Sequence, residues 1–169
     1  MNWMESLVAE FDQECVTTRK YLASAPEEKF GWKPHEKSMS LGTLVSHLAE
    51  NPRWAVTTLT TEVFDYNPVD GEKMEFFQTD KLEEALKRFD EGVEKARQAI
   101  SQAKEEDLDV LWTMQDGGKT VLAMPRWAVL RSFVLSHSTH HRAQLGVYLR
   151  LLDVPVPSAY GPTADDASS

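Results

Sequence analysis

Hydrophobic residues recur every three or four positions along four long stretches of the chain, which is the spacing of an amphipathic helix. The pattern predicts helices over about 3–23, 41–64, 80–103 and 125–152. Pro52 interrupts the second stretch, and we expect it to kink the helix, because the apolar stripe resumes directly after it. Four long amphipathic stretches predict an all-α protein built as a four-helix bundle.

The segments between the predicted helices carry turn signals. Residues 25–34 predict an irregular crossing with buried aromatic side chains, and residues 65–79 predict a loop. Alternating residues on both sides of Asp116-Gly117-Gly118 predict a short hairpin before the last helix. We expect one domain over residues 1–169, with a proline-rich tail that is disordered from about residue 163.

The composition excludes several classes of protein. Of 169 residues, 41% are hydrophobic, which is enough for one domain with a substantial core. No apolar run approaches the roughly 20 residues that span a bilayer, and the N-terminus lacks the basic start of a signal peptide. We therefore expect a cytoplasmic protein with no membrane partner. The single cysteine, Cys15, excludes an internal disulfide and is expected to pack in the core.

The charge argues against a nucleic-acid partner. The chain carries a net charge of -9, and its basic residues are interleaved with acidic ones rather than gathered in a stripe. Proteins that bind nucleic acids draw most of their affinity from basic groups that neutralise phosphates. We therefore expect no nucleic-acid binding, and the acidity is expected to serve solubility.

Three of the five histidines lie within one turn of the last predicted helix. At about 100° per residue, His137 and His141 fall inside the apolar stripe of that helix, whereas His140 lies on its flank. Arg142 lies on the far side, where we expect a surface or dimer contact. Imidazoles one turn apart have Cβ atoms roughly 5–6 Å apart, so both rings can reach one metal ion at about 2.0–2.1 Å. The alternative is a pair of structural core histidines.

His47 is the third candidate ligand. It lies at the edge of the apolar stripe of the second predicted helix, about 90 residues before His137. A third imidazole would complete a site with an open coordination position, the pattern of catalytic rather than structural zinc. Taken alone, His47 also fits a core histidine that is hydrogen-bonded to a carbonyl.

Two motifs resemble those of the DinB-like superfamily. The stretch "FGWKPHEKSMSLGTLVSHLAE" combines an aromatic crossing, a capping Ser40 and a helix bearing His47. The stretch "HSTHHRAQLGVYLRLLDVPVPSAYGP" combines a last helix bearing His-x3-His-Arg-x-Gln with a tail that ends in Tyr-Gly-Pro. Asp153 stands where such helices often end in glycine, and we expect a local change in the cap. The resemblance covers nearly the whole chain.

The resemblance implies a fold and a metal site. The fold is a four-helix bundle in an up-down-down-up arrangement, commonly a homodimer. The metal is a divalent ion, usually zinc or nickel, held by His47, His137 and His141. The sequence does not choose between these metals, because imidazole suits several of them. No catalytic residue is assigned.

Three functions remain open at this point. Characterised members of the superfamily include transferases that join a small thiol to an electrophile. This chain is expected to be such a divalent-metal-dependent enzyme. Metal-assisted hydrolysis is a weaker version of the same hypothesis. The alternative is a non-catalytic metal or small-molecule binding protein of the stress response. In a third interpretation the histidines only fill the core, and no metal binds.

Overall fold

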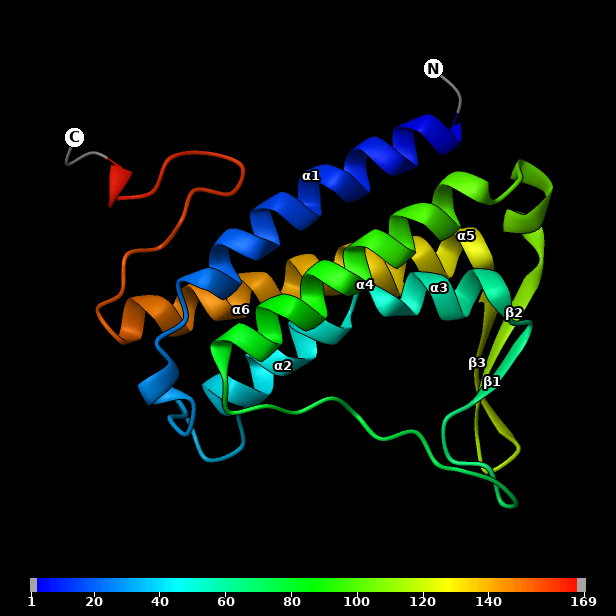
Figure 1. The fold of residues 1–169 in the computed structure, drawn as a ribbon, viewed down its shortest axis with the longest axis horizontal. Coiled ribbons are helices and arrows are strands. Elements are labelled where there is room, and N and C mark those ends of the chain that lie inside the picture. Colours follow the sequence, from blue (N-terminus) through cyan, green and yellow to red (C-terminus); the bar gives the residue numbers. More distant parts are fainter. Residues whose placement is uncertain (1–2, 167–169) are drawn as a thin grey trace.

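Four helical stretches pack side by side and form most of the molecule in the computed structural model, which describes residues 3–166 (Figure 1). In Figure 1 the first and last stretches run from right to left, and the second and third run from left to right. The elements are α1 (Trp3–Ala23), α2 (Leu41–Glu50), α3 (Arg53–Thr60), α4 (Leu82–Gln102), α5 (Arg126–Val129), a π-helix (Leu130–Ser136) and α6 (His137–Leu151), with short 3-10 turns at Glu27–Lys29 and Glu105–Asp109.

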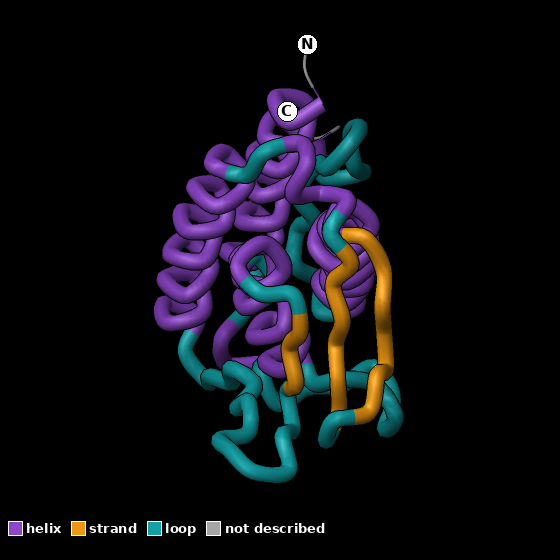
Figure 2. Tube along the Cα trace, turned by 90° about the vertical axis from the view of Figure 1, so that its right-hand side faces the viewer, coloured by secondary structure: helices purple, strands orange, loops and turns teal. Residues whose placement is uncertain are grey.

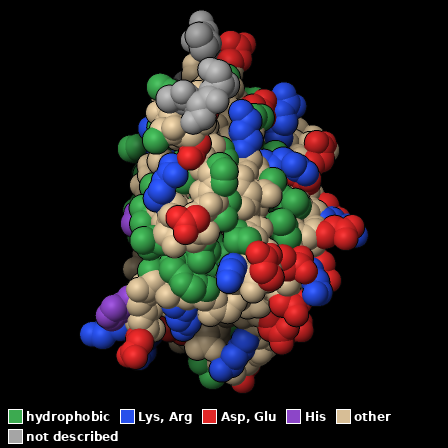
Figure 3. Space-filling model, turned by 90° about the vertical axis from the view of Figure 1, so that its left-hand side faces the viewer, with side chains coloured by type: hydrophobic (Ala, Val, Ile, Leu, Met, Phe, Trp, Pro, Cys, Tyr) green, Lys and Arg blue, Asp and Glu red, His purple; other side chains and the backbone are tan. Residues whose placement is uncertain are grey.

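The core lies between these helices. Leucines on one face of α2 are fully buried against α1, α4 and α6. Phe11 from α1 and Phe89 from α4 fill the space between the first and third stretches. Among residues 3–166, no helix combines the length and the hydrophobicity that a membrane crossing requires. The face drawn in Figure 3 carries acidic and basic side chains intermixed around an apolar centre.

A three-stranded sheet packs beside the helices, so the expectation of an all-α fold was wrong in this part (Figure 2). The predicted hairpin is present as β2 (Leu111–Asp116) and β3 (Lys119–Pro125). Gly117 and Gly118 form its turn with φ of 59° and 77°, a conformation that glycine adopts at little cost. The unpredicted strand β1 (Val63–Asp65) lies parallel to β2. A three-residue strand is too short to show an alternating pattern, and its pairing is set by packing.

The second helical stretch is interrupted at the predicted place. α2 ends at Glu50 and α3 begins at Arg53, while Asn51 and Pro52 keep helical dihedral angles. Around Pro52 the backbone hydrogen bonds join residues that are three positions apart instead of four. The Ala55 N–H, for example, donates to the Pro52 carbonyl at 3.1 Å. α3 ends at residue 60 rather than near 64, because β1 begins at residue 63.

The last helical stretch ends near its predicted residue, but with the usual left-handed cap rather than the expected local change. Asp153 adopts the left-handed conformation with φ of 58°, in the place where a glycine is common. The Val154 N–H donates to the Leu149 carbonyl at 2.9 Å, which closes the helix. The tail folds back toward α6, where Asp165 pairs with Arg150 at 2.6 Å. Residues 163–166 of the expected disordered tail are thus held by hydrogen bonds, and the remainder, 167–169, lies outside the described residues.

Candidate metal centre

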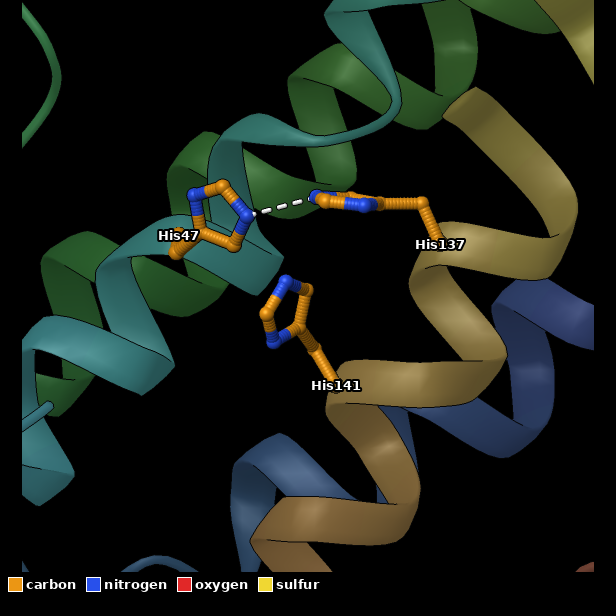
Figure 4. A group of neighbouring side chains, drawn as sticks. All are labelled: His47, His137 and His141. Atoms are coloured by element: carbon orange, nitrogen blue, oxygen red, sulfur yellow. Dashed lines mark hydrogen bonds between the residues drawn. The ribbon is translucent and has the colours of Figure 1, made fainter. Parts of the chain in front are cut away.

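The three predicted ligands come from two helices that cross in the bundle. His47 lies on α2, whose start is fixed by Ser40, because the Ser40 hydroxyl accepts a hydrogen bond from the Thr43 N–H at 3.1 Å. His137 and His141 lie one turn apart at the start of α6. Figure 4 shows their rings pointing toward one another across the space between α2 and α6. The structure therefore brings together the three side chains that the sequence predicts as one cluster.

The ring spacing fits a single metal ion. The ring centroids of His137 and His141 are 4.4 Å apart, and those of His47 lie 5.0 Å and 4.5 Å from them. One ring nitrogen from each histidine lies within 4.8 Å of the others. In a tetrahedral site with metal–nitrogen bonds of about 2.0–2.1 Å, the nitrogens are about 3.3 Å apart. The Nε2 atoms of His47 and His137, at 2.7 Å, share a hydrogen bond and need a small separation to ligate.

The electrostatic environment keeps the three rings neutral, which is the form that binds metal. Burial, and after it the nearby His141 and His47 rings, lower the pKa of His137 to about 4. Burial and His141 also lower the pKa of His47. Burial lowers the pKa of His141, against a raising effect of its hydrogen bond with Gln144. Three neutral imidazoles in one cluster therefore fit a divalent cation.

Gln144, which was not predicted as a site residue, orients one of the three rings. Its side-chain oxygen lies 2.7 Å from Nδ1 of His141. If Nδ1 carries the proton, it donates to Gln144 and leaves Nε2 free as the ligand atom. Hydrogen bonds of this kind fix the ring orientation and tautomer of metal-binding histidines. The signal was present in the sequence, because Gln144 lies one helical turn after His141 on the same side.

A π-helix directly precedes His137 and was not predicted. The seven residues from Leu130 to Ser136 hold one residue more per turn than an α-helix, which shifts the side-chain directions across the segment. The buried Asn51, at the interruption between α2 and α3, donates from Nδ2 to the Phe133 carbonyl at 2.9 Å. Asn51 thus joins the two irregular helix segments that flank His47 and His137. Backbone irregularities of this type give no periodic signal in a sequence.

A cavity of about 400 Å³ opens beside the histidines. His47 and His137 lie in its wall, whereas His141 lies behind them and is 7% exposed. Six aromatic side chains form most of the remaining wall: Trp54, Tyr66, Phe76, Phe77, Trp112 and Phe133. These residues come from α3, the loop after β1, the sheet and the π-helix. The sheet and the loop therefore complete a compartment whose wall includes two of the three clustered histidines.

The other residues singled out in the last helix lie outside the cavity. His140 is exposed, with its ring centroid 4.9 Å from that of His141. Arg142 faces away from the histidines as predicted, but the expected surface contact was wrong. Its side chain is 3% exposed and pairs with Glu14 on α1 at 2.7 Å, because α1 covers this side of α6. Tyr160 from the tail also contacts the Arg142 guanidinium at 2.5 Å.

Cys15 packs in the core, as predicted, and does not join the metal cluster. Burial, and after it the nearby carboxylates of Asp12 and Glu14, raise the pKa of its thiol to about 12. A thiol with this pKa stays protonated at neutral pH, whereas thiolate is the form that acts as nucleophile and metal ligand. Cys15 is therefore a packing residue in this fold.

Comparison with known proteins agrees with this fold. Two solved DinB-like proteins are similar in fold: one from Bacillus cereus (TM-score 0.71, 19% identity, 92% of this chain and 97% of the other) and one from Bacillus subtilis (TM-score 0.68, 22% identity, 91% and 97%). YfiT from Bacillus subtilis, described as a probable metal-dependent hydrolase with an unusual four-helix bundle topology, is also similar (TM-score 0.66, 11% identity, 90% of each chain). A search of the curated proteins found no match. The sequence matches the family model over residues 1–168, and the chain therefore belongs to the DinB family.

Proposed function

We propose that this protein is a divalent-metal-dependent transferase that joins a small thiol to an electrophile. The observation that carries the proposal is the position of the histidine cluster beside a largely apolar cavity of about 400 Å³, with His47 and His137 in the cavity wall. A purely structural cluster needs no adjoining compartment, whereas a reaction needs room beside the metal for a second molecule. Zinc and nickel both suit three imidazole ligands.

The ligand set favours an anionic partner for the metal. Because His47, His137 and His141 are neutral, they leave the double positive charge of the ion uncompensated. A free thiol with a pKa near 8.5 is only about 3% ionised at pH 7. The chemistry that a bound divalent ion supplies here is to hold such a thiol as its thiolate. Ionisation alone gives about a 30-fold gain, so positioning has to supply the rest.

The cavity supplies that positioning. Its aromatic walls hold an apolar electrophile next to His47 and His137 and exclude water from the reacting atoms. The thiolate sulfur then forms a bond to a carbon of the electrophile. The bond between that carbon and its leaving group breaks, the leaving group departs with the electron pair, and the thiol proton passes to solvent.

Hydrolysis is less well supported by the residues of the cavity. A hydrolytic reaction benefits from a free general base that takes a proton from water. Among the described residues, Glu50 is the one carboxylate in the cavity wall, and Arg88 and Arg53 occupy its oxygens at 2.5 Å and 3.3 Å. Thiol transfer needs no such base, because the thiol ionises on binding.

The test measures metal content and turnover together. Protein loaded with zinc or nickel is mixed with 1-chloro-2,4-dinitrobenzene and, in turn, with several small thiols, and thiol conjugation is followed by absorbance. We expect conjugation above the uncatalysed rate, lost together with the metal in His47→Ala and His137→Ala. The exposed His140→Ala serves as the matched control and keeps both.

Other outcomes identify the alternatives. One equivalent of metal with no turnover for any thiol supports a non-catalytic binding protein, and metal content that is negligible and equal in all variants supports core histidines. The homodimer implied by the sequence resemblance remains a prediction, which light scattering on the purified protein checks.

A further inference from the structure

The cavity wall is unusual in its charge, and this limits what can enter. Among the described residues that line it, none is a lysine or an arginine. Six of the lining side chains are aromatic, and methionine and valine extend the apolar surface. A substrate with a carboxylate or a phosphate would therefore lose its hydration without gaining a cationic partner.

The cavity wall carries one negatively charged side chain among the described residues, that of Glu50. Its side chain is 11% exposed and lies in the wall one turn after His47 on α2. Arg88 on α4 binds both of its oxygens, through Nε at 2.5 Å and a second guanidinium nitrogen at 3.1 Å. Arg53 at the start of α3 adds a contact of 3.3 Å. The wall thus presents the carboxylate, while the two guanidinium groups lie behind it.

Phe77 holds the Arg88 guanidinium in this position. The guanidinium carbon lies 5.2 Å from the centre of the Phe77 ring, within the range of a cation–π contact. Phe77 belongs to the loop between β1 and α4 and lines the cavity itself. The donors of Arg88 are therefore engaged by Glu50 and screened by an aromatic ring, and an anionic ligand in the cavity would meet the Glu50 carboxylate first.

We infer that the cavity binds uncharged, flat aromatic compounds, and that Glu50 determines this specificity by engaging Arg88 and Arg53. The volume of about 400 Å³ lies near the lower end of small-molecule sites, which span roughly 300–1,000 Å³. Aromatic walls favour flat rings through stacked and edge-to-face contacts. The inference rests on the proposed function in taking such a compound to be the electrophilic substrate; the binding preference itself stands on the cavity alone.

The test compares two unreactive compounds that differ in one charged group. Binding of 1,3-dinitrobenzene and of 3,5-dinitrobenzoate to the full chain is measured by equilibrium dialysis, with and without zinc. We expect the neutral compound to bind at least about tenfold more tightly than the anion, because the anion loses hydration without a partner. Measurements without zinc show the preference of the wall itself, because a carboxylate is also a metal ligand.

A variant of Glu50 and a matched control test whether Glu50 causes the preference for the neutral compound. Glu50→Gln removes the carboxylate that binds two guanidinium groups behind the wall, so the ratio of the two affinities is expected to fall toward one or to invert. Glu10→Gln is the matched control: it removes the same charge and another glutamate–arginine pair, that with Arg131, between α1 and the π-helix. Should Glu50→Gln fail to fold, Phe76→Ala replaces it, since Phe76 is 59% exposed in the cavity wall. That variant is expected to weaken binding of the neutral compound several-fold.

The outcomes separate this inference from the proposed function. Equal affinity of the wild-type protein for both compounds would overturn the inference, as would an unchanged ratio in folded Glu50→Gln. Selective binding of 1,3-dinitrobenzene without conjugation of 1-chloro-2,4-dinitrobenzene to any thiol would support the aromatic site and contradict the transferase.

Discussion

The side-chain amide of Asn51 donates a hydrogen bond to the main-chain carbonyl of Phe133, 2.9 Å away. Each partner lies where a helix departs from regular geometry: Asn51 at the interruption between α2 and α3, and Phe133 within the π-helix. His47 is one turn before the first of these points, and His137 is one turn after the second. The bond therefore ties together the two segments that set the distance between both ligands.

Asn51→Ala is expected to weaken both stability and metal binding. The Phe133 carbonyl loses a partly buried hydrogen bond, which costs about 1–3 kcal/mol of unfolding free energy, and the two ligand-bearing helices lose a shared anchor. Urea unfolding and zinc titration against a chromophoric chelator measure the two effects. Asn67→Ala is the control. Asn67 lies in the loop after β1, and the substitution removes its hydrogen bond to Asp116 at the end of β2. Equal zinc affinity in the two variants would contradict the role of Asn51.

Gln144→Ala is expected to lower metal affinity with little change in stability. Without the contact between Gln144 and Nδ1 of His141, that ring is no longer fixed in one orientation. Loss of a partner that orients a ligand typically costs about 10–100-fold in metal affinity. Zinc titration measures the change, and Gln98→Ala, which removes an exposed contact with Glu94 on α4, serves as the control. A variant that binds zinc as tightly as the wild type would show that the ring is held by packing alone.

Two arginines in the last helical stretch pair with glutamates of α1, and the two pairs are expected to contribute different amounts to the free energy of unfolding. Arg142 is buried beside Glu14, so Arg142→Met leaves the Glu14 carboxylate without its cationic partner and is expected to cost about 3–5 kcal/mol. Arg131 pairs with Glu10 at the surface, and Arg131→Met is expected to cost less than about 1 kcal/mol. Thermal and urea unfolding compare the variants. Similar losses in both would refute the inference that Arg142 acts as an internal ion pair.

Cys15 is expected to resist alkylation in the folded protein. Its thiol is buried, and its pKa is raised to about 12 from an ordinary value of 9.0. Iodoacetamide at pH 8 should therefore leave native protein unmodified by mass spectrometry, while urea-unfolded protein reacts. The raised pKa also makes the free energy of unfolding depend on pH. The protonated thiol stabilises the folded state fully below pH 9, and this stabilisation is lost as the pH rises toward 12. Cys15→Ala should accordingly lose less stability than the wild type over that range.

The sequence by itself determined the features that depend on neighbours along the chain. The spacing of His137 and His141 places both rings on one side of a helix, and the same periodicity located the long helices. Ser40 as a helix cap and Gly117-Gly118 as a hairpin turn follow from the conformations these residues favour. Such features are fixed by bonds and side chains within a few residues, so a single sequence displays them.

The tertiary structure decided what depends on residues far apart in the chain. β1 forms because β2 offers it a parallel edge, and the buried state of Arg142 depends on α1 covering that side of α6. The π-helix is stabilised in part by Asn51 from another helix. The aromatic cavity gathers residues from helices, sheet and loop. None of these leaves a periodic pattern, because each is set by the packing of whole elements rather than by local preference.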